Sequence, residues 1–175
     1  MIFTPIFIRM GVPLMVHPTT PVFGTAGLED YRLVALLGFL FDTTVAAYRL
    51  IFSGLFEAYP NLQLVLAHLG GTVPYVAERA DRGWAVYPEL KPLISRPPTA
   101  FFKNFYYDTV NFDPAVLELA LKFAGPERLL LGSDYPHQVG DMGRAVEVIG
   151  GLPIAGEVRR AILGENAARL LRLKG

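Results

Sequence analysis

The stretch LLLGSDYPH, residues 129–137, is an apolar run that ends abruptly in a carboxylate. Two other stretches have the same form with a histidine at the end, VPLMVHP at 12–18 and LQLVLAHLGG at 62–71. A strand of a buried parallel sheet reads as a continuous hydrophobic run. A polar residue at its C-terminal end lies where α/β barrels keep their catalytic groups. The three stretches therefore predict pieces of one metal site, carried by His17, His68 and Asp134.

Strands and helices are expected to alternate along the chain. We predict strands at 14–17, 62–67, 106–110 and 129–133, and helices at 43–58, 73–84, 113–125, 142–149 and 156–173, the last with an interruption at Gly164. Such alternation is typical of βαβ units and a parallel sheet. A complete eight-stranded α/β barrel has about 250 residues, and this sequence has 175. Four units therefore predict half a barrel in a single domain spanning residues 1–175.

Local signals mark several helix ends. Asp42 is predicted to be the N-cap of the 43–58 helix. Asp113-Pro114 combines an N-cap residue with a proline at the first helical position, and Gly125-Pro126 combines a C-terminal glycine with a helix breaker. Loops are expected at 18–27 and at the proline-rich 88–98.

The composition excludes several classes of partner and site. Sixteen basic and sixteen acidic residues cancel, and no block of like charge is present, so we expect neither nucleic acid nor a membrane surface as partner. There is no cysteine, so a metal would need histidine and carboxylate ligands, which suit zinc or manganese. Charged residues make up only 18%, below the usual ~25%, which indicates surface that must be covered.

The longest apolar run and the N-terminal residues predict a cytoplasmic protein. The longest apolar run, 33–41, is too short to cross a bilayer and ends at Asp42. Residues 1–5 lack the basic region and cleavage site of a signal peptide.

Five motifs of this chain, taken in order, resemble the amidohydrolase-related family. Within that family they are most similar to the branch containing aminocarboxymuconate-semialdehyde decarboxylase and γ-resorcylate decarboxylase. The resemblance covers nearly the whole chain but only the second half of the family's barrel. It implies the C-terminal half of a (β/α)8 TIM barrel of the metal-dependent hydrolase type. The motifs are VHP at 16–18, AHLGG at 67–71, YDT at 107–109, GSDYP at 132–136 and GENAARLL at 164–171.

The resemblance implies roles for individual residues. His17 and Asp134 would bind a divalent metal, Zn²⁺ or Mn²⁺. His68 would be the catalytic histidine that activates metal-bound water or relays a proton to carbon, and Asp134 would also count among the catalytic residues. Arg79, eleven residues after His68, would reach the substrate carboxylate in a neighbouring subunit. The family's first strand carries a His-X-His or Glu-X-His pair, and this chain has no such pair, because its only other histidine is His137.

Simpler interpretations stay open for each residue. His17 or His68 could be an ordinary strand-end or turn histidine, and Asp134 could cap the turn that follows it. His137 is expected at the surface or in support of a ligand, and Asp108 is expected to orient its neighbours or bond backbone at the third strand tip. Arg79 could be a solvated or ion-paired helix residue.

Three functions remain in competition. The first is decarboxylation of an aromatic or unsaturated carboxylic acid, a small-molecule substrate. The second is hydrolysis of a lactone or amide by the same metal centre. In the third, the chain is an inactive fragment or a half-barrel subunit that needs a complementary chain, since a half barrel leaves two sheet edges unpaired. A homo-oligomer is also expected from the family resemblance.

Overall fold

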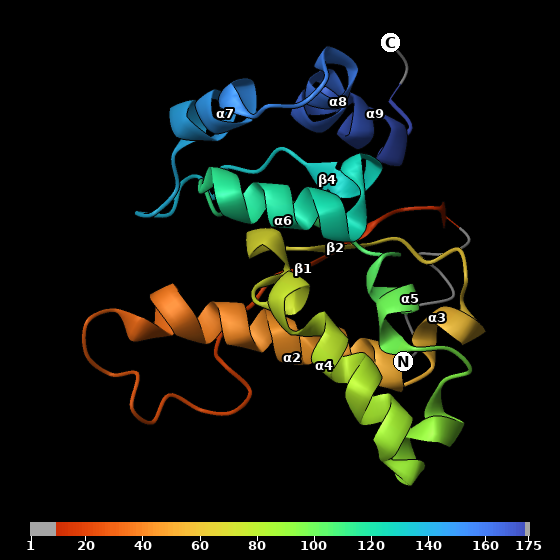
Figure 1. Cartoon of the computed structure of the whole chain (residues 1–175). Coiled ribbons are helices and arrows are strands. Elements are labelled where there is room, and N and C mark those ends of the chain that lie inside the picture. The colour runs from red at the N-terminus through yellow and green to blue at the C-terminus, as the bar shows by residue number, and fades with distance from the viewer. Residues whose placement is uncertain (1–9, 174–175) are drawn as a thin grey trace.

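A four-stranded parallel sheet lies at the centre of the computed structural model, which describes residues 10–173 (Figure 1). The strands β1 (Leu14–Val16), β2 (Leu64–Leu66), β3 (Tyr106–Asp108) and β4 (Leu129–Leu130) lie side by side in chain order, and all neighbours are parallel. The predicted parallel α/β arrangement is therefore confirmed. Each strand is shorter than predicted, because only two or three residues of each pair in register with a neighbour; Ala67, just past β2, still donates its N–H to the Val16 carbonyl at 3.1 Å.

The two faces of the sheet are packed differently. Side chains alternate between the faces of a strand, so Leu66, Tyr107 and Leu129 point together into the main core and are almost completely buried. On the other face, Val65 and Leu130 pack against Leu170 in a much smaller cluster. The second face is the inner wall of the half barrel, and it receives far less cover than the first.

The helices are arranged along the sheet, with α2 and α4 at one end and α7, α8 and α9 at the other (Figure 1). Short π-helical turns lie at η1 (Val34–Gly38) and η5 (Ala161–Glu165), and 3-10 turns lie at η2 (His68–Gly70), η3 (Pro88–Leu93) and η4 (Pro126–Arg128). The α-helices are α2 (Phe39–Phe52), α3 (Leu55–Ala58), α4 (Val73–Val86), α5 (Pro98–Phe102), α6 (Pro114–Ala124), α7 (Met142–Gly151), α8 (Gly156–Arg160) and α9 (Asn166–Leu170).

The predicted N-cap role of Asp42 is wrong. Asp42 lies within α2, because helical backbone already begins at η1. Its buried carboxylate accepts a hydrogen bond from the Val22 N–H at 2.9 Å. Asp42 therefore anchors the long loop before the helix.

Other helix predictions are partly confirmed. Asp113 caps α6 as predicted, accepting the Ala115 N–H at 2.8 Å. The 43–58 helix is broken at Gly54, whose φ of 73° is left-handed. The 156–173 helix is divided by the π-helical turn η5, which contains Gly164. The predicted 88–98 loop contains the 3-10 turn η3 and leads into α5.

Among residues 10–173, one helical segment of 19 residues, Val34–Phe52, is long and apolar enough by composition to cross a membrane, with a mean hydropathy of 1.6 over an 18-residue window. It is longer than the apolar run seen in the sequence, because the helix continues through Asp42. Core helices of soluble proteins also meet this criterion, and Ala47 and Ile51 of this segment are buried in the main core. The residues 1–5, on which the signal-peptide prediction depended, lie outside the described part of the chain.

Candidate active site

The structure brings His17, His68 and Asp134 together at the carboxyl ends of the strands. His17 follows β1 directly, and the rings of His17 and His68 lie edge to face with centroids 5.1 Å apart. His68 Nε2 lies 3.6 Å from Asp134 Oδ1. Residues distant in the sequence thus meet because parallel strands end at the same side of the sheet.

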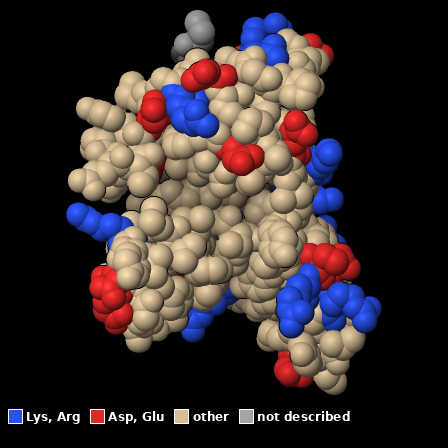
Figure 2. Space-filling model, turned by 60° about the vertical axis from the view of Figure 1, so that its left-hand side comes forward, with Lys and Arg blue, Asp and Glu red and all other residues tan. Residues whose placement is uncertain are grey.

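These side chains line a cavity of about 630 Å³, a size typical of small-molecule sites. Asp108 and His137 add further polar groups to its wall. Figure 2 shows a hollowed face formed mostly by uncharged residues, with Lys, Arg, Asp and Glu mainly toward its edges. The rest of the cavity wall is largely apolar and includes Met15, Val65, Val110, Leu130, Leu170 and Leu171.

Asp108 holds the turn that carries His68. Its carboxylate accepts three backbone N–H bonds, from His68 at 3.0 Å, from Leu69 at 2.8 Å and from Val110 at 3.1 Å. His68 and Leu69 both have left-handed φ values, 53° and 54°, which are unfavourable for residues with a side chain. Burial raises the pKa of Asp108, against the effect of the N–H donors and of nearby His68. The expectation that Asp108 bonds backbone at its strand tip is confirmed.

The two glycines after His68 are required by close packing. A Cβ at Gly71 would lie 2.0 Å from the Leu40 carbonyl oxygen, and a Cβ at Gly70 would lie 2.6 Å from the Tyr107 ring. Both glycines also have positive φ values. The AHLGG motif therefore forms a tight exit from β2 that seats His68 in the cavity wall.

His68 itself is buried and lacks a full set of partners. Its Nδ1 has no hydrogen-bond partner among the described residues, and its Nε2 faces Asp134. A buried polar atom without a partner is costly and is commonly found where function requires it. Of the two ring nitrogens, Nε2 is therefore the one that faces the carboxylate of Asp134.

His17 is held by its own loop. Its Nδ1 lies 2.8 Å from the Pro18 carbonyl oxygen, so the proton belongs on Nδ1 and Nε2 keeps a lone pair. Metal-binding histidines are oriented by this kind of bond through the other ring nitrogen.

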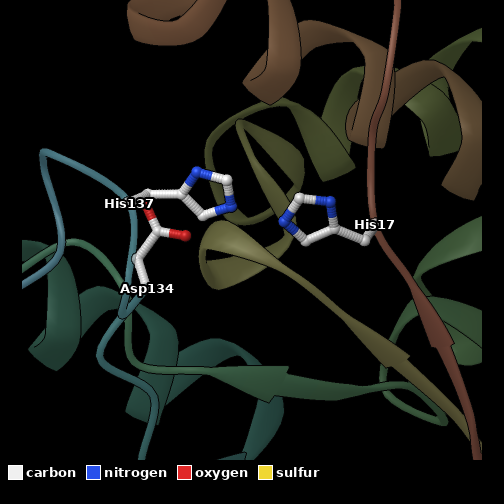
Figure 3. A group of neighbouring side chains, drawn as sticks. All are labelled: His17, Asp134 and His137. Carbon is white, nitrogen blue, oxygen red and sulfur yellow. The ribbon is translucent and has the colours of Figure 1, made fainter.

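His137, for which the sequence predicted only a supporting or surface position, faces the same point. Figure 3 shows His17, Asp134 and His137 around one space, and one ligand atom from each lies within 4.8 Å of the others. A tetrahedral ion with bonds of ~2.1 Å places its ligands ~3.4 Å apart, so modest side-chain movement would bring these atoms to bonding distance. Imidazole and carboxylate donors suit zinc and manganese, and the residues therefore fit a divalent metal. The Asp-X-X-His spacing was the one signal that could have revealed His137.

Arg79 lies on α4, is exposed and is not among the residues that line the cavity. Its predicted contact with a substrate carboxylate was assigned to a neighbouring subunit, so that role stays a prediction.

Comparison with known proteins places these features in context. The profile of a family described as Amidohydrolase matches residues 6–173. The chain is 32% identical over 173 residues to γ-resorcylate decarboxylase of Rhizobium radiobacter, covering 95% of this chain and 52% of that protein. It is 29% identical over 168 residues to 2-amino-3-carboxymuconate-6-semialdehyde decarboxylase of Dictyostelium discoideum, covering 94% and 46%.

A solved structure is also similar. Dihydroxybenzoic acid decarboxylase of Polaromonas sp. JS666, crystallised with manganese and the inhibitor 2-nitroresorcinol, superposes with a TM-score of 0.84 at 29% identity. The match covers 98% of this chain and 53% of that one. This chain spans about half the length of the curated relatives it matches. The predicted fold, half of a (β/α)8 barrel, is thereby confirmed.

Proposed function

We propose, because this chain belongs to the amidohydrolase family, that it forms part of a metal-dependent decarboxylase for an aromatic or unsaturated carboxylic acid. The convergence of His17, His68 and Asp134 in one apolar-walled cavity carries the proposal. The relatives and the solved structure named above are decarboxylases of such acids. We further propose that residues 1–175 form a single domain, active in the cytoplasm.

His17 and Asp134 are proposed as metal ligands. A bound divalent ion would supply positive charge that holds a substrate carboxylate or a neighbouring oxygen. Zinc and manganese both fit the donor atoms, and manganese is present in the solved dihydroxybenzoic acid decarboxylase. Asp134 also faces His68 at 3.6 Å, so one carboxylate serves both a ligand role and the orientation of the histidine.

His68 is proposed to deliver the proton. When the bond between the ring or alkene carbon and the carboxylate breaks, its electron pair stays on carbon and CO₂ leaves. That carbon then takes a proton from His68 Nε2, and solvent returns the proton to the histidine. The apolar residues Val65, Leu130 and Leu170 line the cavity, where they offer an aromatic ring an apolar surface.

A second candidate, a half-barrel subunit that needs a complementary half, is favoured by the inner face. Met15 of β1 is 64% exposed and Leu171 is 54% exposed, although both line the cavity. Apolar groups in a barrel interior are normally covered on all sides. We propose that the covering half, on this chain or another, closes the cavity during catalysis.

The test is release of CO₂ from hydroxybenzoic acids by the purified chain loaded with Mn²⁺ or Zn²⁺, with and without an added N-terminal half of a relative's barrel. The substrate should lose its carboxylate as CO₂, and His68→Ala should abolish this reaction. A ring-opened lactone or hydrolysed amide as product would support the hydrolase alternative instead. Unchanged turnover in His68→Ala would contradict the proposed role of His68.

A further inference from the structure

We propose that His137 is a direct metal ligand, so that this chain alone supplies a three-residue metal site with His17 and Asp134. The inference deepens the proposed function and rests on it, because it assigns the third ligand of the same site. The sequence had offered only two ligands from this chain, too few for a tight site. The carrying observation is the group of three ligand atoms, each within 4.8 Å of the others (Figure 3).

The loop after β4 fixes where His137 lies relative to Asp134. The His137 N–H donates to the Asp134 carbonyl at 2.9 Å, and the Gly140 N–H donates to the His137 carbonyl at 2.9 Å. The Asp141 N–H donates to the Ser133 carbonyl at 2.9 Å and closes the loop. Two successive turns thus place the aspartate and the histidine three residues apart on one side of a short, hydrogen-bonded loop.

Gly140 shows how tightly this loop is closed. A Cβ there would lie 2.4 Å from the Asp134 carbonyl oxygen. The loop backbone therefore folds directly against the residue that carries the carboxylate ligand. The relation between Asp134 and His137 is a property of this loop and does not depend on the rest of the barrel.

His17 completes the group from the end of β1, which lies at the opposite edge of the sheet from β4. Its ring and that of His137 are nearly parallel, with an interplanar angle of 14° and centroids 6.1 Å apart. Because Nδ1 of His17 is already bonded to the Pro18 carbonyl, Nε2 is the atom left for a metal. Two imidazole nitrogens and one carboxylate oxygen leave at least one coordination position open, as catalytic zinc sites do.

His68 lies outside this group. It is buried, its Nε2 faces Asp134 at 3.6 Å, and it is not one of the three grouped ligands. The structure thus divides the histidines into two ligands, His17 and His137, and one residue that is left to move a proton. This division supplies a matched control, because a variant of His68 removes an imidazole next to the site without removing a proposed ligand.

The test measures metal binding by the full 175-residue chain, without any turnover. Titration calorimetry with Zn²⁺ and Mn²⁺ would compare the wild type with His137→Ala, His17→Ala and His68→Gln. His137 is exposed, so its replacement should leave the fold intact, which circular dichroism would check. We expect His137→Ala to weaken binding about 100-fold, at or above the largest loss caused by residues that merely support a ligand. We expect His68→Gln to weaken it by about tenfold, the lower end of the loss caused by residues that support a ligand.

A spectroscopic count of imidazoles keeps the proposal falsifiable if affinities are hard to compare. Pulsed electron paramagnetic resonance of bound Cu²⁺ should detect two coordinated imidazoles in the wild type and one in His137→Ala. Equal affinity and equal imidazole counts in both proteins would overturn the proposal, as would a wild-type chain that binds no metal. Neither result would decide the decarboxylase proposal, because that proposal is tested separately by CO₂ release from the completed barrel.

Discussion

Replacing Asp108 should lower the free energy of unfolding more than replacing an exposed aspartate that also accepts backbone hydrogen bonds. Its carboxylate is the acceptor for the N–H groups of His68, Leu69 and Val110, at 2.8 to 3.1 Å. Asp108→Ala would leave all three donors without their partner. A buried donor left unsatisfied costs about 1–3 kcal/mol.

The magnitude follows from where these donors lie. Asp108 lines the cavity, so water can reach part of the vacated space, and we use the lower end of the range for each donor. Three donors then give a loss of about 3 kcal/mol in the free energy of unfolding. The left-handed backbone at His68 and Leu69 would also lose its support, which adds to the loss. A typical domain has a total stability of only about 5–15 kcal/mol.

Urea denaturation, followed by circular dichroism, would measure the effect. Asp113→Ala is the matched control, because Asp113 also accepts backbone N–H bonds, from Ala115 and Val116, but at an exposed helix start. Loss of such a cap costs about 1 kcal/mol. The reasoning is refuted if Asp108→Ala loses no more stability than Asp113→Ala.

Two further predictions concern packing and pH. Gly71→Ala should lower the free energy of unfolding by about 2 kcal/mol or more, because the new Cβ would meet the Leu40 carbonyl oxygen at 2.0 Å and the backbone φ there is 64°. Gly150→Ala is the control and should be neutral or stabilising, because nothing lies within 4 Å of a Cβ at that position. Equal stability of the two variants in urea denaturation would contradict this prediction. The hydroxyl of Ser95 and then its N–H hold the pKa of Glu57 below its usual value. Because this pKa is lowered in the folded state, the stabilisation is present above the unfolded pKa of ~4.3 and is lost as the pH falls through the folded pKa. An NMR titration should show the pKa of Glu57 rising in Ser95→Ala, and identical titration curves in both proteins would speak against the bond.

Features that depend on neighbouring residues in the sequence were predictable. The apolar runs before His17, His68 and Asp134 identified the strands, because a buried strand is recognisable from its own composition. The cap at Asp113 was predictable for the same reason, since the donors it satisfies lie within three residues of it. The ends of the strands were not, because they depend on where a partner strand stops.

Two features that depend on contacts distant in the sequence were missed. Asp42 looked like a helix cap, but its actual partner is Val22, twenty residues away across a long loop. His137 looked like a surface residue, and it is one, yet its relation to His17 is invisible without the fold. In both cases the residue type was informative, and only the partner was unknown.

The supports of the candidate site are all local to this half of the barrel. His17 is oriented by the Pro18 carbonyl, His68 by the Asp108 carboxylate, and Asp134 by the closed loop that also carries His137. None of these contacts needs a strand from the other half of the barrel. The apolar cavity wall, in contrast, is left open along the inner face of the sheet, where Met15 is exposed. We therefore expect metal binding and catalysis to be separable properties, because the first depends on supports within this chain and the second depends on closing the cavity around the substrate.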